Sequence, residues 1–443
     1  MASEWQVVSL ADAPVQIIDG DRGKNYPKQS DFSDQGHCLF LNASNVTVQG
    51  FNFSQCQYIT TEKDQVLRKG RLERNDVVMT TRGTVGNVAF YSDNVPFDHI
   101  RINSGMVIFR ADRNRLSPLF LYQALRSKLF GAQVATLRTG SAQPQLPIRD
   151  INRIRIPIPP FQKQQAIACI LGALDDKIEL NRRMNETLEA MARTIFKSWF
   201  VDFDPVREKM ERKAAKMQGR KEENQDDSFA PLHPGALVLD PAIADLFPNE
   251  FEESELGEIP KGWKVVSVGE VCELAYGKAL KASMRKPGEV LVMGSNGQVG
   301  WHDTPLAAGP GIIVGRKGNP GVVTWVNSDF FPIDTTFYVV PRLTWVPLPY
   351  LYYSLMGLGL PNLSADSAVP GLNRNIAYMS WLLLPSREIL EVFARHARLI
   401  MDRVNQGEQE NRTLAALHDA LLPRLISGEL RVPDAEKLVE AAV

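Results

Sequence analysis

Few residues of this sequence have the types and spacing that a catalytic or metal site requires. The chain has no G-x-x-x-x-G-K-[ST] loop for nucleotide phosphates. Gly315–Gly321 is glycine-rich and basic, but its spacing differs from that loop. No H-E-x-x-H motif and no cluster of His and Cys indicates a metal site. We therefore expect no catalytic residue and no metal ligand in this chain, although a site split across the fold would escape a motif search.

A different set of residues could contact nucleic acid. Two glycine turns each carry a cation, because Arg82 precedes Gly83 and Arg316-Lys317 precedes Gly318. Tight turns let backbone N–H groups and arginines approach phosphates or base edges, and Arg, Asn and Gln can each form two hydrogen bonds with a purine. The candidate DNA-binding residues are Arg82, Arg138, Thr139, Ser141, Gln143, Lys278, Lys281, Arg285, Arg316, Lys317, Asn373, Arg374 and Asn375. For any one of them, a solvated surface loop is the more common alternative.

These candidates lie in a sequence that is internally duplicated. Residues 141–200 align with residues 367–426 at a constant shift of 226, without a gap. Earlier similarities between the two halves have shifts of 258, 235 and 230. A shift that is constant over about sixty residues indicates duplication. The drifting shift before it indicates two globular units that share a plan but differ in loop lengths.

Each copy of the aligned segment has the periodicity of a long helix with an apolar seam. Seam residues recur every three or four positions, and prolines stand just before each helix. The predicted pairing residues are Ile167, Ile170, Leu174, Met184, Leu188, Met191, Ile195, Phe393, Ile400, Leu414, Leu417 and Leu421. Polar residues interrupt both seams, where they could fix the register of a pair. We expect an antiparallel coiled-coil pair of about forty residues, or roughly 60 Å, although two ordinary core helices remain the alternative.

The predicted fold class is mixed α/β, with two α/β units separated by two long antiparallel helices in a pseudo-twofold internal repeat. In the first unit, β-like runs are followed by a helix over 118–130, a loop over 138–145 and a strand over 154–158. The predicted boundaries are 1–157 for the first unit, 158–221 for the first helical region, 222–258 for an acidic connector, 259–384 for the second unit, 385–427 for the second helical region and 428–443 for a tail.

The composition indicates a cytoplasmic protein and bears on its partners. The 443 residues include no apolar run of transmembrane length, and the start lacks the features of a signal peptide. Four scattered cysteines suggest reduced thiols. The net charge of −1 conceals an asymmetry: residues 222–258 contain 11 acidic and no basic residues, so the remaining chain carries a net charge of +10. That excess is compatible with a nucleic-acid partner.

Five segments resemble the specificity subunit of type I restriction–modification systems. They occur in the expected order over nearly the whole chain. The segments are Pro157-Ile-Pro-Pro-Phe-Gln-Lys-Gln-Gln165, Leu174-Asp-Asp-Lys-Ile-Glu-Leu-Asn181, Phe196-Lys-Ser-Trp-Phe-Val-Asp-Phe-Asp-Pro205, Gly257-Glu-Ile-Pro-Lys-Gly-Trp263 and Leu421-Leu-Pro-Arg-Leu-Ile-Ser-Gly-Glu-Leu430.

The resemblance implies that each globular unit is a target recognition domain that reads one half of a bipartite, asymmetric sequence in double-stranded DNA. The helices would set the spacer and dock two modification (methyltransferase) subunits, and restriction (translocase–nuclease) subunits would join for cleavage. The chain would be a non-catalytic subunit that binds no cofactor, with S-adenosylmethionine, ATP and magnesium on its partners. Pro385-Ser-Arg-Glu-Ile389 departs from Pro159-Pro-Phe-Gln-Lys163, so the two docking surfaces would differ.

Three alternatives stay open at this point. Methyltransferase or nuclease chemistry could be hidden in the globular units. Ile158-Pro-Pro-Phe161 lacks the Asn or Asp that the N-P-P-F motif of adenine methyltransferases uses to hold the adenine amino group, which argues against that enzyme. The chain could also be a coiled-coil scaffold that reads no sequence, or the specificity subunit of a type II system that cleaves outside its site.

Overall fold

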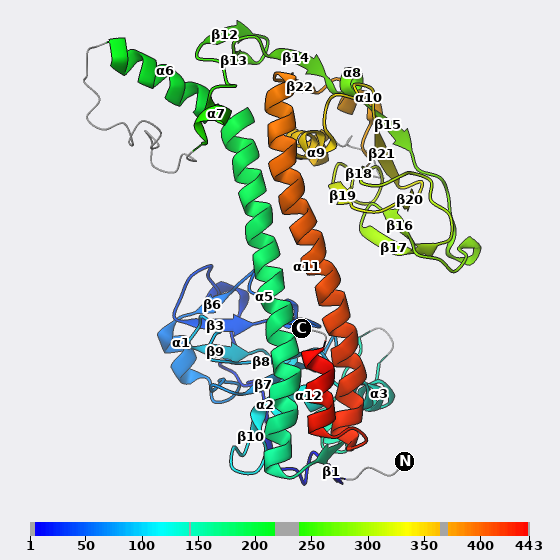
Figure 1. Ribbon diagram of the computed structural model, residues 1–443. Coiled ribbons are helices and arrows are strands. Elements are labelled where there is room, and N and C mark those ends of the chain that lie inside the picture. Colours follow the sequence, from blue (N-terminus) through cyan, green and yellow to red (C-terminus); the bar gives the residue numbers. More distant parts are fainter. Residues whose placement is uncertain (1–4, 141–142, 218–238, 364–370, 442–443) are drawn as a thin grey trace. The chain divides into compact units, whose positions relative to one another are not determined.

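The computed structural model describes residues 5–140, 143–217, 239–363 and 371–441 (Figure 1). The chain divides into two compact units: unit 1 is Met1–Asn181 with Gln409–Val443, and unit 2 is Arg182–Glu408. The long helices α5 (Phe161–Phe200) and α11 (Arg387–Ser427) each contribute to both units. No helix among the described residues combines the length and apolar character needed to cross a membrane.

Unit 1 is built on a four-stranded antiparallel sheet with the strand order β2-β10-β7-β8. A three-stranded sheet, β6-β3-β9, contains a parallel pair of β3 and β9, and β1 pairs with β11. The strands are β1 (Gln6–Ser9), β2 (Val15–Asp19), β3 (Cys38–Leu41), β4 (Val46–Thr47), β5 (Gly50–Phe51), β6 (Tyr58–Ile59), β7 (Val77–Thr80), β8 (Val88–Phe90), β9 (Ile100–Ile102), β10 (Met106–Ala111) and β11 (Arg155–Ile158).

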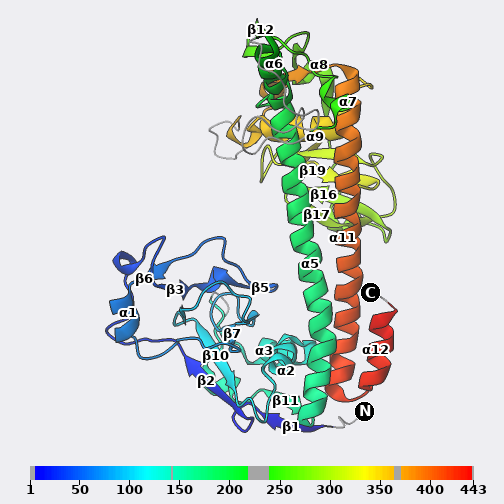
Figure 2. The ribbon, with the colours of Figure 1, turned by 60° about the vertical axis from the view of Figure 1, so that its left-hand side comes forward.

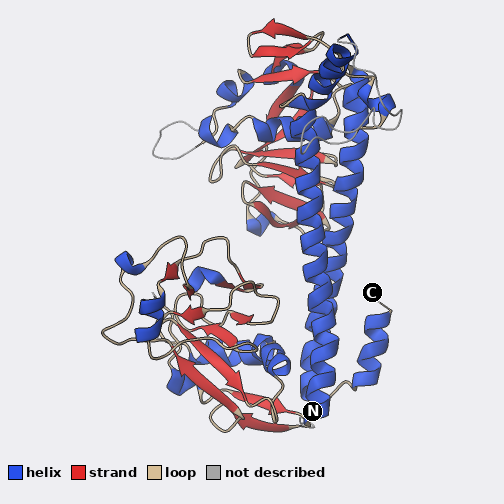
Figure 3. Ribbon diagram, turned by 90° about the vertical axis from the view of Figure 1, so that its left-hand side faces the viewer, coloured by secondary structure: helices blue, strands red, loops and turns tan. Residues whose placement is uncertain are grey.

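Alternating residues bury both faces of this four-stranded sheet. Val77 and Met79 pack in the same cluster as the apolar residues of α2 (Pro118–Arg126) and α5, whereas Val78 and Ile108 pack with those of the three-stranded sheet. Because neighbouring side chains of a strand point to opposite faces, continuous apolar strands of this kind fit a sheet covered on both sides. Figure 3 shows α2 and its neighbouring helix between these strands and the long helices of unit 1.

The single helix expected over 118–130 is wrong, because two helices occupy residues 118–137. Ser127 has an extended backbone between α2 and α3 (Lys128–Leu137), and its Oγ accepts a hydrogen bond from the N–H of Phe130 at 3.2 Å. A serine that caps a new helix in this way ends the preceding one, although the apolar pattern continues through it. The other helices of unit 1 are α1 (Thr61–Val66), α4 (Ile148–Ile151) and α12 (Val432–Glu440).

Unit 2 repeats the strand order of unit 1. Its four-stranded sheet has the order β15-β21-β18-β19, its three-stranded sheet has the order β17-β16-β20 with β16 and β20 parallel, and β14 pairs with β22. The strands are β14 (Lys264–Ser267), β15 (Cys272–Tyr276), β16 (Val290–Gly294), β17 (Gly297–His302), β18 (Gly311–Gly315), β19 (Val323–Val326), β20 (Phe330–Pro332), β21 (Thr336–Pro341) and β22 (Trp381–Leu384). The predicted internal repeat is therefore confirmed at the level of sheet topology.

The described part of the acidic connector is more regular than an irregular surface segment. It contains α7 (Pro241–Ala244), β12 (Phe251–Ser254) and the first half of β13 (Gly257–Pro260), which pairs with β12. Glu250 lies 3.4 Å from Lys213 of α6 (Asp204–Met217) and 2.8 Å from Lys261. The remaining helices of unit 2 are α8 (Val268–Val271), α9 (Leu348–Gly357) and α10 (Arg374–Tyr378).

In each unit, segments of α5 and α11 lie side by side and antiparallel (Figures 1 and 2). In unit 1, Lys177 of α5 forms an ion pair with Glu410 of α11 at 3.1 Å. Asp175, which precedes Lys177 on α5, lies 3.8 Å from His418, which follows Glu410 on α11, so the two helices run antiparallel. In unit 2, the aromatic residues Phe196 and Phe200 of α5 contact Phe393 of α11. The predicted antiparallel packing of the two helices is therefore confirmed.

Of the twelve predicted seam residues, six are buried, five are half-buried and one is exposed. The buried seam residues are Ile167, Ile170, Leu174, Phe393, Leu414 and Leu421, and the half-buried ones are Met184, Leu188, Ile195, Ile400 and Leu417. Met191 is 51% exposed, while its neighbour Ala192 is fully buried. Successive residues of a helix point about 100° apart. The buried stripe therefore passes through the small side chain of Ala192, and the larger Met191 faces away from it.

Candidate nucleic-acid interface

The glycine turns singled out in the sequence have the same geometry in both units. Gly83 and Gly86 have φ of 72° and 97°, and Gly318 and Gly321 have φ of 85° and 80°. Glycine adopts these values without the steric penalty that other residues meet. In each turn, the N–H of the second glycine donates to the carbonyl of the last residue of the preceding strand, at 2.9 Å in unit 1 and 2.8 Å in unit 2.

A second loop crosses each glycine turn through equivalent contacts. In unit 1, Arg82 forms a β-bridge with Gln145, and the N–H of Leu146 donates to the carbonyl of Thr81 at 2.9 Å. In unit 2, Lys317 forms the same bridge with Gly371, and the N–H of Leu372 donates to the carbonyl of Arg316 at 2.9 Å. Each unit therefore joins two distant candidate segments into one surface.

The unit 1 surface brings together Arg82 and the predicted loop over 138–145. Thr139 forms a β-bridge with Gln145, which in turn bridges Arg82. Arg82, Arg138, Thr139 and Gln143 are exposed. Ser141 lies outside the described residues. Contact of this surface with DNA stays a prediction.

In unit 2, five candidates line one pocket of about 400 Å³. Arg316 and Lys317 come from the glycine turn, and Asn373, Arg374 and Asn375 come from the start of α10. The Oδ1 of Asn373 accepts a hydrogen bond from the N–H of Asn375 at 2.9 Å, so this side chain also caps the short helix. Tyr276 and Phe337 form the aromatic part of the lining.

The remaining basic candidates of unit 2 are partly engaged within the protein. Arg285 is half-buried, and its Nη1 donates to the carbonyl of Val299 in β17. Lys278 and Lys281 are exposed. The run from Lys278 to Lys286 has no acidic residue in sequence, yet the Nζ of Lys286 lies 3.8 Å from Asp303. The run is therefore not a uniformly free basic patch in space.

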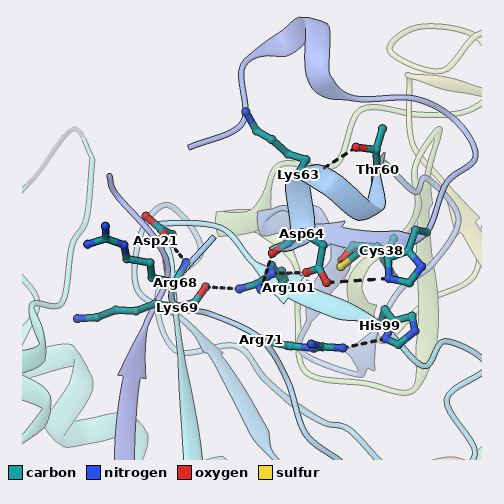
Figure 4. Close-up of polar contacts among 12 residues, drawn as sticks. Asp21, Cys38, Thr60, Lys63, Asp64, Arg68, Lys69, Arg71, His99 and Arg101 are labelled. Atoms are coloured by element: carbon teal, nitrogen blue, oxygen red, sulfur yellow. Dashed lines mark hydrogen bonds and ion pairs between the residues drawn. The ribbon is translucent and has the colours of Figure 1, made fainter. Parts of the chain in front are cut away.

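Sequence reasoning missed a buried ion pair in the three-stranded sheet of unit 1 (Figure 4). Arg101 of β9 pairs with the carboxylate of Asp64 in α1, and it also donates to the carbonyls of Asp64 and Lys69, both at 2.8 Å. Burial alone would raise the pKa of Asp64, but the hydrogen bond and charge of Arg101 lower it. The pair joins residues 37 positions apart, for which the sequence has no local signal.

Two histidines stand beside this ion pair. The rings of His37 and His99 are 4.2 Å apart between centroids, and Arg71 donates to the Nδ1 of His99 at 3.2 Å. Because an arginine can only donate, Nδ1 of His99 is the acceptor in this contact. These contacts make His99 part of the packing around β3 and β9.

Gln164 is a further residue whose role the sequence did not reveal. It is almost fully buried in the first turn of α5, where its amide donates to the carbonyl of Pro159 at 2.8 Å. Its Oε1 accepts from the N–H of Ser117, the residue that caps α2, at 2.8 Å. Gln164 therefore joins the start of α5 to the start of α2. The equivalent residue of the second copy is the buried Leu390.

The described residues supply no recognisable metal site, because no group of three or more His, Cys, Asp or Glu among them is suitably arranged. The four cysteines are not linked by disulfides. Burial raises the pKa of the Cys38 thiol to about 12 and that of Cys272 to about 12. Neither thiol is therefore ionised near neutral pH, whereas a cysteine nucleophile has to be a thiolate.

Comparison with known proteins finds relatives of this chain. Residues 2–190 match the family model described as the type I restriction modification DNA specificity domain. The chain is 24% identical to the type I restriction enzyme HindI specificity subunit of Haemophilus influenzae, over 97% of this chain and 100% of that protein. It is 22% identical to the MjaIX specificity subunit of Methanocaldococcus jannaschii, over 82% of this chain and 79% of that protein.

A solved structure has the same fold. The crystal structure of the type I restriction–modification S subunit from M. genitalium matches with a TM-score of 0.58 and 15% identity, over 96% of both chains. The sequence relatives and the matching family model agree with the duplicated architecture described above. Over nearly its whole length, the chain is thus similar to specificity subunits of type I restriction–modification systems.

Proposed function

We propose that this chain is the DNA-recognition subunit of a type I restriction–modification complex, in which each unit reads one half of a bipartite, asymmetric site. The observation that carries the proposal is the repeated crossing of a glycine turn by a second loop. Units 1 and 2 form it with the same bridge and the same backbone hydrogen bond. A reading surface conserved in backbone and variable in side chains is what two half-sites of one DNA molecule require.

The side chains at equivalent positions of the two crossings differ. These positions hold Thr81, Arg82 and Gln145 in unit 1, of which Thr81 is buried. In unit 2 they hold Arg316, Lys317 and Gly371. Because bases are distinguished by the donors and acceptors on their edges, different side chains on one backbone plan would select different bases. The two half-sites would then differ in sequence, which makes the whole site asymmetric.

The long helices would set the distance between the half-sites. The helices α5 and α11 have 40 and 41 residues, and they pack antiparallel within each unit. In this proposal their outer faces dock two methyltransferase subunits, which bind S-adenosylmethionine and transfer the methyl group to adenine. Restriction subunits, with ATP and magnesium, join for cleavage. This chain then contributes recognition and assembly, with no catalytic step of its own.

The proposal is tested by co-expressing the chain with the methyltransferase subunit encoded beside it and sequencing the host DNA for N6-methyladenine. A new two-part motif with a fixed gap is the expected result, and it reveals both half-sites at once. An active methyltransferase that produces no motif would overturn sequence reading and favour a scaffold. Purified chain that methylates or cuts DNA alone would instead favour hidden catalysis.

A further inference from the structure

The pocket of unit 2 has an aromatic floor on which two arginines stack. The guanidinium carbon of Arg316 lies 4.9 Å from the ring centroid of Tyr276, and that of Arg374 lies 4.8 Å from the same centroid. The Tyr276 ring rests at 5.0 Å between centroids on Phe337, which is buried in the core. Tyr276 itself is 48% exposed, so the two stacked cations lie at the surface end of a column that begins in the core.

Further contacts restrict the orientation of both arginines. Arg374 also stacks on Tyr378 at 5.6 Å, and the hydroxyl of Tyr378 accepts a hydrogen bond from the N–H of Leu274 at 3.0 Å. Arg316 donates from Nη1 to the carbonyl of Asp334 at 3.1 Å. A guanidinium held by stacking keeps its N–H donors in one plane, which suits a ligand with two acceptors side by side.

The pocket offers hydrogen-bond donors in excess over free acceptors. Arg316, Lys317 and Arg374 can only donate. The Oδ1 of Asn373 is already engaged by the N–H of Asn375. No described residue accepts a hydrogen bond from the guanidinium of Arg374, and its Nε is buried without a partner. Unpaired buried donors are uncommon in folded proteins and call for an explanation. The pocket is thus suited to a ligand whose facing edge carries acceptors.

At the equivalent positions, unit 1 has other residues than those that line this pocket. The strand registers make Asp19 the equivalent of Tyr276, and Val107 the equivalent of Phe337. Thr81 and Ile148 stand where unit 2 has Arg316 and Arg374. In unit 1, therefore, neither an aromatic floor nor a stacked cation occupies these four positions.

We propose that this pocket of unit 2 takes the major-groove edge of a guanine, with Arg374 as the residue that specifies it. The inference rests on the proposed function and adds a base and a residue to it. Guanine presents two adjacent acceptors, N7 and O6, in the major groove, and an arginine can bind both. Adenine and cytosine each present an amino group there, which would place a donor against the three cations of the pocket.

A DNA phosphate would also satisfy these donors, but the geometry favours the base edge. A phosphate contact needs positive charge, which a mobile exposed lysine supplies. This pocket instead holds two planar cations by stacking in a concave site. Two hydrogen-bond donors fixed in one plane can distinguish a base edge that carries two acceptors from the edges of the other bases. The test therefore has to separate the base from the phosphate.

The experiment uses the chain in complex with its methyltransferase partner and DNA carrying the motif found by methylation sequencing. Each guanine of the two half-sites is replaced in turn by 7-deazaguanine, which lacks N7 and keeps the phosphates. Inosine, which keeps N7 and O6, is the control base. Binding is measured for the unaltered complex and for complexes with Arg374→Ala, Arg374→Lys and Lys264→Ala. Lys264 of β14 is an exposed cation of unit 2 that lies outside the pocket and is not a candidate for DNA contact.

We expect one guanine, in one half-site only, at which 7-deazaguanine weakens binding at least about fivefold and inosine does not. Arg374→Ala and Arg374→Lys should weaken binding to natural DNA, and neither should respond to 7-deazaguanine at that position. Lys264→Ala should keep the full response. Thermal melting of each variant shows that unit 2 is still folded.

Two results would overturn the inference. If Arg374→Ala weakens binding equally on natural and 7-deaza DNA, and Arg374→Lys restores it, the contact is with a phosphate. If no guanine responds although the complex still binds its two-part motif, the pocket does not read this base. A complex that shows no motif at all is a separate outcome, because it contradicts the proposed function before the pocket is tested.

Discussion

Asn181 of α5 donates a hydrogen bond from Nδ2 to the Oδ1 of Asn411 in α11, at 3.1 Å, inside the helix pair of unit 1. Asn411 in turn donates to the carbonyl of Ile178 at 3.3 Å. In unit 2, the equivalent of Asn411 is Asn185, which donates to the carbonyl of Val404 at 3.1 Å. Polar pairs inside an apolar seam favour one register, because any slip leaves their amides buried without partners.

Replacing Asn411 should therefore destabilise unit 1. Asn411→Ala removes the acceptor for the buried amide of Asn181, so we expect a loss of about 1–3 kcal/mol in the free energy of unfolding. Gln409→Ala removes an exposed amide from the same helix and should change it by less than about 0.5 kcal/mol. The two urea midpoints are compared. Equal midpoints would mean that the Asn181–Asn411 contact adds nothing to the stability of the pair.

The apolar part of the seam makes a second prediction. Leu414 is fully buried in the core of unit 1, so Leu414→Ala should lower the free energy of unfolding by about 2–5 kcal/mol. Leu399 lies on the same helix but is 66% exposed, and Leu399→Ala should have little effect. Thermal melting of both variants checks this difference. An unchanged melting temperature for Leu414→Ala would contradict the helix packing described here.

Two helical glycines should respond in opposite directions to alanine. A Cβ at Gly172 of α5 meets no atom within 4 Å, so Gly172→Ala should stabilise by up to about 1 kcal/mol through helix propensity. A Cβ at Gly407 of α11 would lie 2.6 Å from the Oδ1 of Asn185 and would displace its hydrogen-bonded amide. The unpaired amide would cost about 1–3 kcal/mol. Calorimetry on both variants should show melting temperatures on either side of the parent value.

Local periodicity and repetition account for what could be predicted from the sequence. The constant shift between the copies indicated two long helices and two related units, and the mid-seam position of Asn181 indicated a register device. The end of α2 at Ser127 could not be predicted in this way, because the apolar spacing of α2 continues past that residue. Met191 was assigned to the seam because it is large and apolar, whereas the seam at that turn accommodates the small Ala192.

The composition of the candidate site depends on contacts that no local pattern reports. The pairing of β15 with β21, and of β21 with β18, brings Tyr276 and Phe337 close to Arg316 and Arg374. The Arg and Asn side chains were chosen for their hydrogen-bonding groups alone. Their stacking on one tyrosine, and the lack of an equivalent in unit 1, follow only from the strand registers. Long-range pairing of this kind leaves no periodic signal in the chain.

His418 of α11 makes the stability of unit 1 depend on pH. Its Nε2 lies 3.1 Å from the Oε1 of Gln123 and 3.8 Å from Asp175, and Arg126 donates to the same carboxylate at 2.6 Å. Asp419 lies 4.0 Å from its Nδ1. Burial lowers the pKa of His418, and the charge of Asp175 offsets only part of that effect.

The sign of the pH effect follows from the lowered pKa. The folded state binds fewer protons at His418 than the unfolded chain, so the stabilisation is complete above about pH 6.5 and declines as the pH falls through that value. We expect the urea midpoint of the parent chain to fall from pH 7.5 to pH 5 more steeply than that of His418→Gln. Parallel curves for the two proteins would show that His418 does not titrate differently in the folded state.

Arg82 and Lys317 occupy equivalent positions on the two reading surfaces, so matched variants can separate the half-sites. Each forms the β-bridge to the crossing loop of its own unit, and each side chain is exposed. Arg82→Ala should relax the sequence requirement in one half-site and Lys317→Ala in the other, each by about 1–3 kcal/mol if the side chain contacts a base. Methylation sequencing with each variant reports both half-sites in one experiment. Loss of methylation at every site, without a change of motif, would assign these cations to phosphates; relaxation of the same half-site by both variants would contradict two independent reading surfaces.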